Sequence, residues 1–265
     1  MTAAEHFHAL HKGPSILILP NAWDAMSAKI VEGAGAKAIA TSSAAVAWAH
    51  GYADGHHLPF ELLLRTAAEI VRVVKVPVTC DSEGGYADTP EAAAENIRRL
   101  IDIGVVGVNL EDGRDAHDLH TRKVAAIRKA AAASGVDLFI NARTDVYLKG
   151  LVSAEKRLAE SVRRGAALKD EGASGIFVPG AAASDIPALV KEIQLPLNIM
   201  GWAGVPKAAE LQAMGVRRLS AATNMARAAW ATLAKSAKMY LFDGDNDALT
   251  AMGEAGVDYN ALFKG

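Results

Sequence analysis

The sequence predicts an α/β fold, specifically a (β/α)8 TIM barrel with a C-terminal helical extension. Short apolar segments of strand character alternate with longer segments of helical periodicity, and about eight such units fit into the 265 residues. A glycine ends many of the predicted helices just before the next strand, at Gly35, Gly104, Gly135, Gly172 and Gly215. An open doubly wound sheet is the alternative, but the first predicted strand is followed by no glycine-rich dinucleotide turn.

The first half of the chain supplies four strands, each justified by its flanking residues. A helix over residues 2–11 precedes an apolar strand over 15–19, which Pro20 ends because proline lacks the amide hydrogen of a strand ladder. Thr89 and Pro90 are the N-cap and first-turn proline of a later helix. The other predicted elements of this half are a helix over 24–32, a strand over 38–41, a helix over 59–73 and strands over 76–81 and 105–111.

The second half repeats the same unit four times and then adds an extension. The predicted helices cover residues 119–134, 153–171, 184–193 and 205–214, and the strands that follow them cover 137–143, 175–178, 196–200 and 216–219. A further helix over 225–241 leads into an acidic segment. We therefore expect one domain over residues 1–265, in which residues 243–265 form a helical tail that packs on a partner subunit.

Composition narrows the class of protein. The formal net charge is −2 and the Lys and Arg residues are scattered, so we expect no nucleic-acid partner. The single cysteine, Cys80, excludes an intrachain disulfide and is expected in the core. The amino terminus does not resemble a signal peptide, and no apolar run reaches the ~20 residues of a membrane span. We expect a cytoplasmic protein without membrane contact.

Polar side chains gather where the predicted strands end. The carboxyl ends of barrel strands face one side, which is where the active sites of such barrels lie. Thr79, Asp81 and Glu83 share one face of their strand because side chains alternate. The strand ends carry Thr41, Ser42 and Ser43, then Asp81 and Glu83, then Glu111, then Asn141 and Arg143, and then Asn198 and Ser220.

Three of these carboxylates predict a metal site. If the strands that end at Asp81 and Glu111 are neighbours about 5 Å apart, then Asp81, Glu83 and Glu111 form one oxygen cage. Crowded carboxylates need a cation, and oxygen ligands suit Mg²⁺, with Mn²⁺ as an alternative, better than zinc. A solvated loop of acids is the competing interpretation.

Arg143 suggests an anionic ligand. It either neutralises Glu111 or Asp81, or it clamps a substrate carboxylate together with Thr41, Ser42 and Ser43. Asn198 would add a hydrogen bond. With a metal at the other end, the pocket would accept a small anionic carboxylate.

The motifs resemble the isocitrate lyase and phosphoenolpyruvate mutase superfamily. They read Pro-Asn-Ala-Trp-Asp-Ala from Pro20, Asp-Ser-Glu-Gly-Gly-Tyr from Asp81, Asn-Leu-Glu-Asp from Asn109 and Ala-Arg-Thr-Asp from Ala142. The resemblance implies a barrel that binds Mg²⁺ and 2-oxo or 2-hydroxy carboxylates, often with the last helix exchanged between subunits, and so a homodimer or homotetramer. It implies metal-site roles for Asp81 and Glu83, an outer acid acting through water at Glu111, an acid near metal and substrate at Asp54, and a substrate contact at Trp23.

One departure limits the functional prediction. The loop from Gly113 to His120 contains none of the Lys-Lys-Cys-Gly-His sequence that isocitrate and methylisocitrate lyases carry there, and it lacks the longer insertion of the mutases. The proton donor is therefore unassigned. His117 and His120 are candidates, as are His50, His56 and His57 near Asp54.

The function predicted from these features is that of a Mg²⁺-dependent lyase or decarboxylase for a small 2-oxo or 2-hydroxy (di)carboxylate. The metal would polarise the oxo group while Arg143, Glu111 and Asp54 serve the reaction. One alternative is a phosphonopyruvate-type carbon–phosphorus mutase or hydrolase. The other is a barrel that binds a dicarboxylate without turnover.

Overall fold

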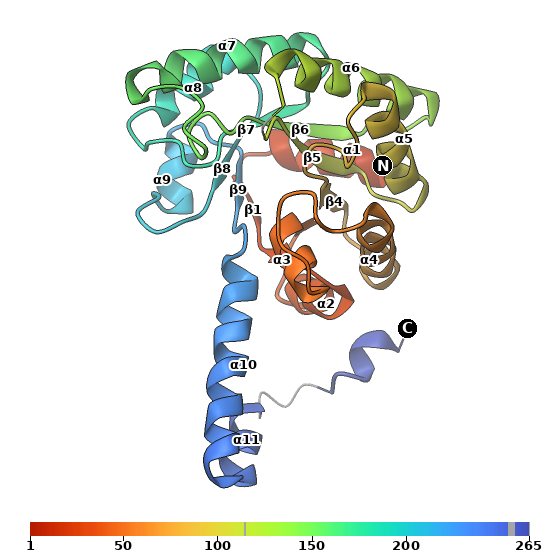
Figure 1. Ribbon diagram of the computed structural model, residues 1–265, viewed down its shortest axis with the longest axis vertical. Coiled ribbons are helices and arrows are strands. Elements are labelled where there is room, and N and C mark those ends of the chain that lie inside the picture. Colours follow the sequence, from red (N-terminus) through yellow and green to blue (C-terminus); the bar gives the residue numbers. More distant parts are fainter. Residues whose placement is uncertain (114, 254–257, 265) are drawn as a thin grey trace.

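The computed structural model describes residues 1–113, 115–253 and 258–264, which form a TIM-type barrel with an extended C-terminal arm (Figure 1). Nine parallel strands lie in the order β1-β9-β8-β7-β6-β5-β4-β3-β2. The strands are β1 (Leu17–Leu19), β2 (Asn21–Ala22), β3 (Ile39–Thr41), β4 (Val78–Asp81), β5 (Gly107–Glu111), β6 (Phe139–Arg143), β7 (Gly175–Phe177), β8 (Leu197–Met200) and β9 (Arg218–Ser220). The predicted fold class is confirmed.

The first strand of the barrel is divided into two short strands, β1 and β2, at Pro20. β1 pairs with β9, whereas β2 pairs with β3, so the two halves of one chain segment join both ends of the sheet. Pro20 lies between them and has no N–H to continue the ladder. The sequence predicted β1 but not β2, because the Asn21–Ala22 segment is too short to show a strand pattern.

Helices surround the barrel. They are α1 (Ala3–Lys12), α2 (Ala25–Gly33), α3 (Ser43–Ala49), α4 (Phe60–Val73), α5 (Pro90–Asp102), α6 (His117–Ala133), α7 (Arg157–Asp170), α8 (Ile186–Ile193), α9 (Ala208–Ala213), α10 (Asn224–Asp243) and α11 (Asn246–Gly253), with 3-10 turns at Ala154–Lys156 and Ala261–Phe263. α3 was not predicted from the sequence. It begins inside the hydroxyl-rich segment, where Ser42 is its N-cap.

The two sides of the strands differ in character. Their outer faces pack with the helices in one large apolar cluster that includes Cys80, as expected. A second, smaller cluster closes the amino-terminal end of the barrel, where Phe7 of α1 meets Leu17, Leu19 and Phe139. The middle of the interior is polar, with buried Asn109, Asn141, Asn198 and Arg218. The barrel interior therefore has a polar layer in its middle and an apolar cluster at its amino-terminal end.

α10 projects away from the barrel, and α11 lies beside its far end (Figure 1). The surface of α10 is largely apolar near its C-terminal end, where Leu241 and Phe242 are 84% and 88% exposed. The predicted tail starts here, although residues 254–257 and 265 lie outside the described residues. In the part of the chain that the structure describes, none of the helices combines the length and apolar character needed to cross a membrane.

Candidate active site

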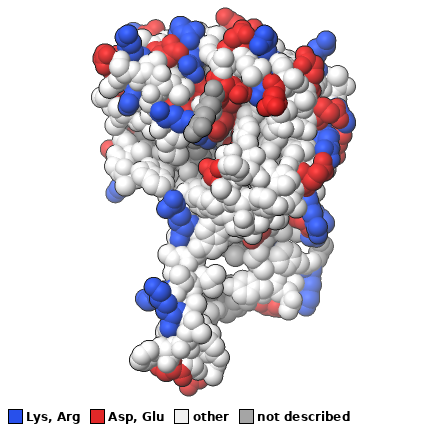
Figure 2. Space-filling model, in the orientation of Figure 1, with Lys and Arg blue, Asp and Glu red and all other residues white. Residues whose placement is uncertain are grey.

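A cavity of about 500 Å³ opens at the carboxyl ends of the barrel strands. Acidic side chains gather around a hollow in this face of the molecule (Figure 2). The charged residues that line the cavity are Asp54, Glu83, Glu111, Asp112, Asp115, Arg143 and Lys149, with Ser43, His56 and His57 beside them. The predicted gathering of polar strand ends is thus present, and acids dominate it.

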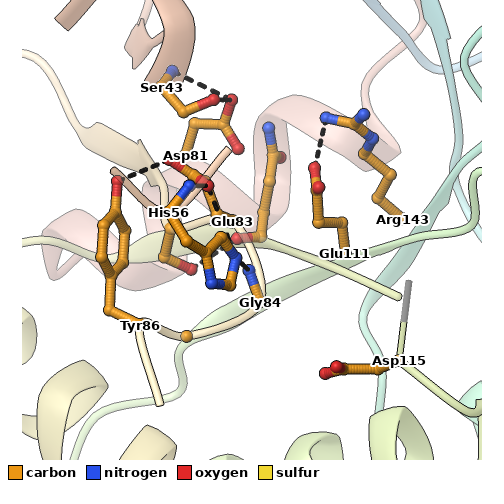
Figure 3. A network of polar contacts seen from close by, with 12 residues as sticks. Ser43, His56, Asp81, Glu83, Gly84, Tyr86, Glu111, Asp115 and Arg143 are labelled. Carbon is orange, nitrogen blue, oxygen red and sulfur yellow. Dashed lines mark hydrogen bonds and ion pairs between the residues drawn. The ribbon is translucent and has the colours of Figure 1, made fainter. Parts of the chain in front are cut away.

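Asp81 at the end of β4 is held by the start of α3 (Figure 3). The backbone N–H and the hydroxyl of Ser43 donate to Asp81 Oδ2 at 3.1 and 2.9 Å. The other oxygen, Oδ1, is buried and has no hydrogen-bond partner in the protein. Asp81 itself is not among the residues that line the cavity, but a buried carboxylate oxygen without a partner is unfavourable, which makes Oδ1 a candidate ligand for a cation.

Glu83 lies in a tight turn directly after β4. Its φ is +47°, so it has left the strand and no longer shares the strand alternation of Asp81. Tyr86 donates its hydroxyl to Glu83 Oε1 at 2.8 Å, and the backbone N–H of His56 donates to Oε2 (Figure 3). Burial, together with the charges of Asp81 and Asp54, raises the pKa of Glu83 to about 7.

His56 is a neutral partner of this turn. The backbone N–H of Gly84 donates to His56 Nε2 at 2.9 Å, which requires that this nitrogen carry no proton. Burial and the charge of Lys123 lower the pKa of His56, in agreement with the neutral ring. A Cβ at Gly84 would lie 2.9 Å from the imidazole, so only glycine allows this contact.

Lys123 of α6 fixes the same turn from below. Its ammonium is buried and donates to the carbonyl of Gly84 at 2.9 Å and to Asp115 Oδ2 at 2.6 Å. Asp115 belongs to the loop after β5 and lines the cavity. The lysine therefore ties that loop to the turn that carries Glu83.

Arg143 lies among carboxylates. Its Nη1 lies 2.6 Å from Glu111 Oε2, and its Nε and Nη2 donate to the two oxygens of Asp145 at 2.7 and 3.1 Å. Lys149 adds contacts of 3.4 Å to Glu111 and 2.8 Å to Asp145. Burial raises the pKa of Glu111, as do Asp145 and Asp81, against the opposing effect of Arg143 and Lys149. The ion pair with Glu111 corresponds to the first of the two interpretations of Arg143, neutralisation of an acid.

The expected cage of three carboxylates is not preformed. In residues 1–113, 115–253 and 258–264, no three His, Cys, Asp or Glu side chains lie close enough together to hold an ion. In this structure Glu83 turns toward Tyr86 and Glu111 is paired with Arg143. A divalent cation still fits the donor set, because the free Oδ1 of Asp81 would be an oxygen ligand. Burial, and to a smaller extent neighbouring carboxylates, raises the pKa of Asp54 and of Glu83 beside it.

The other predicted contact residues are placed as follows. Asp54 and Ser43 line the cavity, but Thr41 and Ser42 do not. Thr41 accepts from the backbone N–H of Asp81 at 2.8 Å, and Ser42 caps α3. Asn198 is buried inside the barrel beside Ser220, and Trp23 packs on Trp230 of α10 with ring centroids 5.6 Å apart.

The histidine candidates divide into two groups. His56 and His57 line the cavity. His120 is fully buried in α6, where burial lowers its pKa to about 4 and Nε2 lies 3.0 Å from the carbonyl of Leu110. His117 and His50 do not line the cavity, and His50 bonds to Thr66. The structure therefore brings only His56 and His57 to the site.

Sequence reasoning missed Lys149 and Tyr86. Lys149 follows Asp145 by four residues, so the spacing of an ion pair was visible, although its direction into the cavity was not. Tyr86 ends the Asp81 to Tyr86 motif, but its hydroxyl reaches Glu83 only because both residues have positive φ angles, +47° and +53°. Both contacts depend on backbone turns that composition does not reveal.

An acid-lined cavity at the carboxyl end of a (β/α)8 barrel, with a buried carboxylate oxygen available to a ligand, has the architecture of a barrel enzyme. The family model described as phosphoenolpyruvate phosphomutase matches residues 7–241. The chain belongs to this family, within the PEP mutase/isocitrate lyase superfamily, and the resemblance predicted from its motifs is confirmed.

Individual relatives differ in their descriptions. A solved Burkholderia cenocepacia structure described as a candidate phosphonomutase is 41% identical, covers 89% of this chain and 99% of its own, and has a TM-score of 0.85. An uncharacterised Mycobacterium tuberculosis protein is 32% identical over 81% of this chain and 80% of its own. The 2-methylisocitrate lyase of Bacillus subtilis is 26% identical over 80% of this chain and 73% of its own.

Proposed function

We propose that the chain is a divalent-metal-dependent lyase or decarboxylase that acts on a small 2-oxo or 2-hydroxy (di)carboxylate. The observation that carries the proposal is Asp81, whose Oδ1 is buried without a protein partner beside acids of raised pKa. Mg²⁺ is the ion of choice for such carboxylate oxygens, with Mn²⁺ as a substitute. When bound, the cation would polarise the substrate's oxo group and stabilise the charge of an enolate.

The chain's own residues would orient this chemistry. Ser43 keeps Asp81 in place through two hydrogen bonds, and Glu83 and Glu111 would hold water around the cation. Lys149, with its side chain 36% exposed, and Arg143 supply positive charge for the substrate carboxylate. Lys123 fixes the loop after β5 beside the cavity. Because Arg143 is already paired with Glu111, substrate binding would have to share its guanidinium between the two anions.

The test is a substrate screen. Oxaloacetate, 2-methylisocitrate, isocitrate and phosphonopyruvate are incubated with Mg²⁺ and, separately, with EDTA, and products are followed by NMR. The proposal expects a metal-dependent product from a carboxylate substrate and competition by oxalate, an enolate mimic. If phosphonopyruvate alone reacts, and binds more tightly than oxalate, the carbon–phosphorus alternative replaces it. That alternative is favoured by the 41% identity to the described phosphonomutase.

The third hypothesis is a barrel that binds without turnover. It expects metal-dependent binding of oxalate and no product from any of the four substrates. The absence of a cysteine from the loop between β5 and α6 supports this hypothesis. The cysteine of the Lys-Lys-Cys-Gly-His sequence, which serves acid-base chemistry in isocitrate and methylisocitrate lyases, is missing there.

We also propose that the chain forms a homodimer or homotetramer through α10 and the tail. Exposed apolar residues on this arm, Leu233, Leu241 and Phe242, lack partners on the barrel of the same chain, because the arm points away from it (Figure 1). On a second copy, Ile18 of β1 and Ile30 of α2, which are 52% and 49% exposed, are apolar side chains that the arm would cover. Shared burial of both surfaces would explain their exposure in one chain.

A further inference from the structure

Arg218 crosses the inside of the barrel below the active site. It comes from β9, and its Nη2 donates to Asn109 Oδ1 of β5 at 3.3 Å. In the sheet order β9 and β5 are four strands apart, on opposite walls of the barrel. The guanidinium therefore spans the interior. The register pairs Asn109 with Asp81, so this contact ends directly beside the strand that carries the ligand-ready carboxylate.

The guanidinium has little to balance it. Arg218 is 1% exposed, and its Nε and Nη1 have no hydrogen-bond partner in the protein. None of the ion pairs among the described residues includes it. Burial lowers its pKa to about 9, opposed by the charge of Asp81, so the group stays protonated at neutral pH. A buried cation of this kind is unfavourable unless other charged groups interact with it.

The buried polar groups in the same layer as Arg218 can interact with its positive charge. Thr79 Oγ1, Asn141 Oδ1 and Asp81 Oδ1 are buried acceptors without protein partners. Asn141 also donates to the same Asn109 oxygen that Arg218 reaches, at 2.8 Å. The buried layer that holds Arg218 thus also contains free acceptors on β4, at Thr79 and Asp81, and on β6, at Asn141. Charge interactions are strongest in such surroundings.

We propose that Arg218 is a positioning residue that sets the electrostatic balance of the site from the barrel floor: its charge weakens cation binding at Asp81 and strengthens binding of the anionic substrate. The site above it is rich in acids, so an anion would otherwise meet a mainly negative surface. This inference rests on the proposed function, because it assumes a metal and a carboxylate ligand. It assigns Arg218 no contact with either.

The test uses two ligands whose charges are opposite. Mn²⁺ binding to the metal-free full chain is measured by electron paramagnetic resonance, and oxalate binding to the Mn²⁺-loaded chain by calorimetry. In Arg218→Gln, which can keep a hydrogen bond to Asn109, we expect Mn²⁺ to bind at least threefold more tightly and oxalate at least threefold more weakly. Arg218→Lys keeps the charge and is expected within twofold of the parent for both ligands.

A second variant guards against a folding failure. Asn109→Asp keeps the oxygen that accepts from Arg218 and Asn141, pairs the guanidinium with a carboxylate without removing it, and is expected to give the same pair of opposite shifts. If both affinities fall together, or neither moves, in whichever variants fold, Arg218 is only a structural residue and the inference is overturned. If the parent chain itself binds neither Mn²⁺ nor oxalate, the proposed function fails first, and the inference falls with it.

Discussion

Glu111 and Arg143 are register partners on neighbouring strands β5 and β6, and their side chains form a 2.6 Å ion pair at the edge of the cavity. The pair explains why Arg143 can lie half-buried at the end of an apolar strand. It also means that the residue expected to bind substrate is structural at the same time, so that its replacement has two consequences.

Replacing Arg143 should destabilise the fold. Arg143→Met leaves Glu111 and Asp145 buried without their guanidinium, and breaking such a pair typically costs about 3 to 5 kcal/mol. Urea unfolding measures the loss. Arg143→Lys keeps one charge and should lose clearly less. Equal stability of Arg143→Met and the parent would show that the pair contributes nothing. Oxalate binding should be lost in Arg143→Met samples that remain folded.

Asp81 should dominate metal binding. Asp81→Asn keeps the size of the side chain but removes the charge and the anionic oxygen, and we expect Mn²⁺ affinity to fall by about 100-fold, roughly 2.7 kcal/mol. Titration with paramagnetic Mn²⁺ detects this directly. Asp118→Asn, which alters an exposed carboxylate of α6, is the matched control. Unchanged affinity in Asp81→Asn would remove this residue from the metal site.

Glu83 should make the metal-free protein less stable at high pH. Its folded-state pKa of about 7 lies above the ordinary value of about 4.5, so the folded state binds more protons between these values and stability falls as pH rises through this window. From pH 5 to pH 8 the group should contribute a loss on the order of 2 kcal/mol.

The comparison is with Glu83→Gln, unfolded by urea in EDTA at both pH values. The variant should lose on the order of 2 kcal/mol less than the parent over this range. Added Mn²⁺ should restore stability to the parent at pH 8, because a bound cation favours the ionised carboxylates. Parallel pH profiles of the two proteins would contradict the raised pKa.

Lys123 should control the order of the turn after β4. Lys123→Met removes the donor to Gly84 and to Asp115, leaving a buried carbonyl unpaired at about 1 to 3 kcal/mol. Amide hydrogen exchange in residues 82–86 should accelerate, with turnover of any substrate reduced. Lys129→Met on the exposed side of α6 should change neither. Unaltered exchange in Lys123→Met would show that the turn holds itself.

The arm should determine the oligomeric state. Leu241→Asp combined with Phe242→Asp places two charges in the most exposed apolar part of α10, and light scattering with size-exclusion chromatography should then report a monomer. Lys235→Ala on the same helix is the control and should leave the assembly intact. An oligomer that survives the double substitution would place the interface elsewhere.

Much of the fold was readable from the sequence alone. Proline and glycine punctuation fixed the order of helices and strands, as Thr89 and Pro90 did for α5, because these residues restrict the backbone locally. The sequence also determined which residues stand at the strand ends, and hence that Asp81, Glu111 and Arg143 gather at one side of the barrel. It identified the family through the same motifs.

Only the tertiary structure decided which partner each of these side chains contacts. Strand alternation predicted Glu83 beside Asp81, but a positive φ angle turned it toward Tyr86. The pairing of Glu111 with Arg143 depends on strand register, and the reach of Arg218 to Asn109 depends on barrel closure. The last two contacts join residues far apart in the chain, and local sequence pattern carries no information on which of several nearby partners a charge will contact.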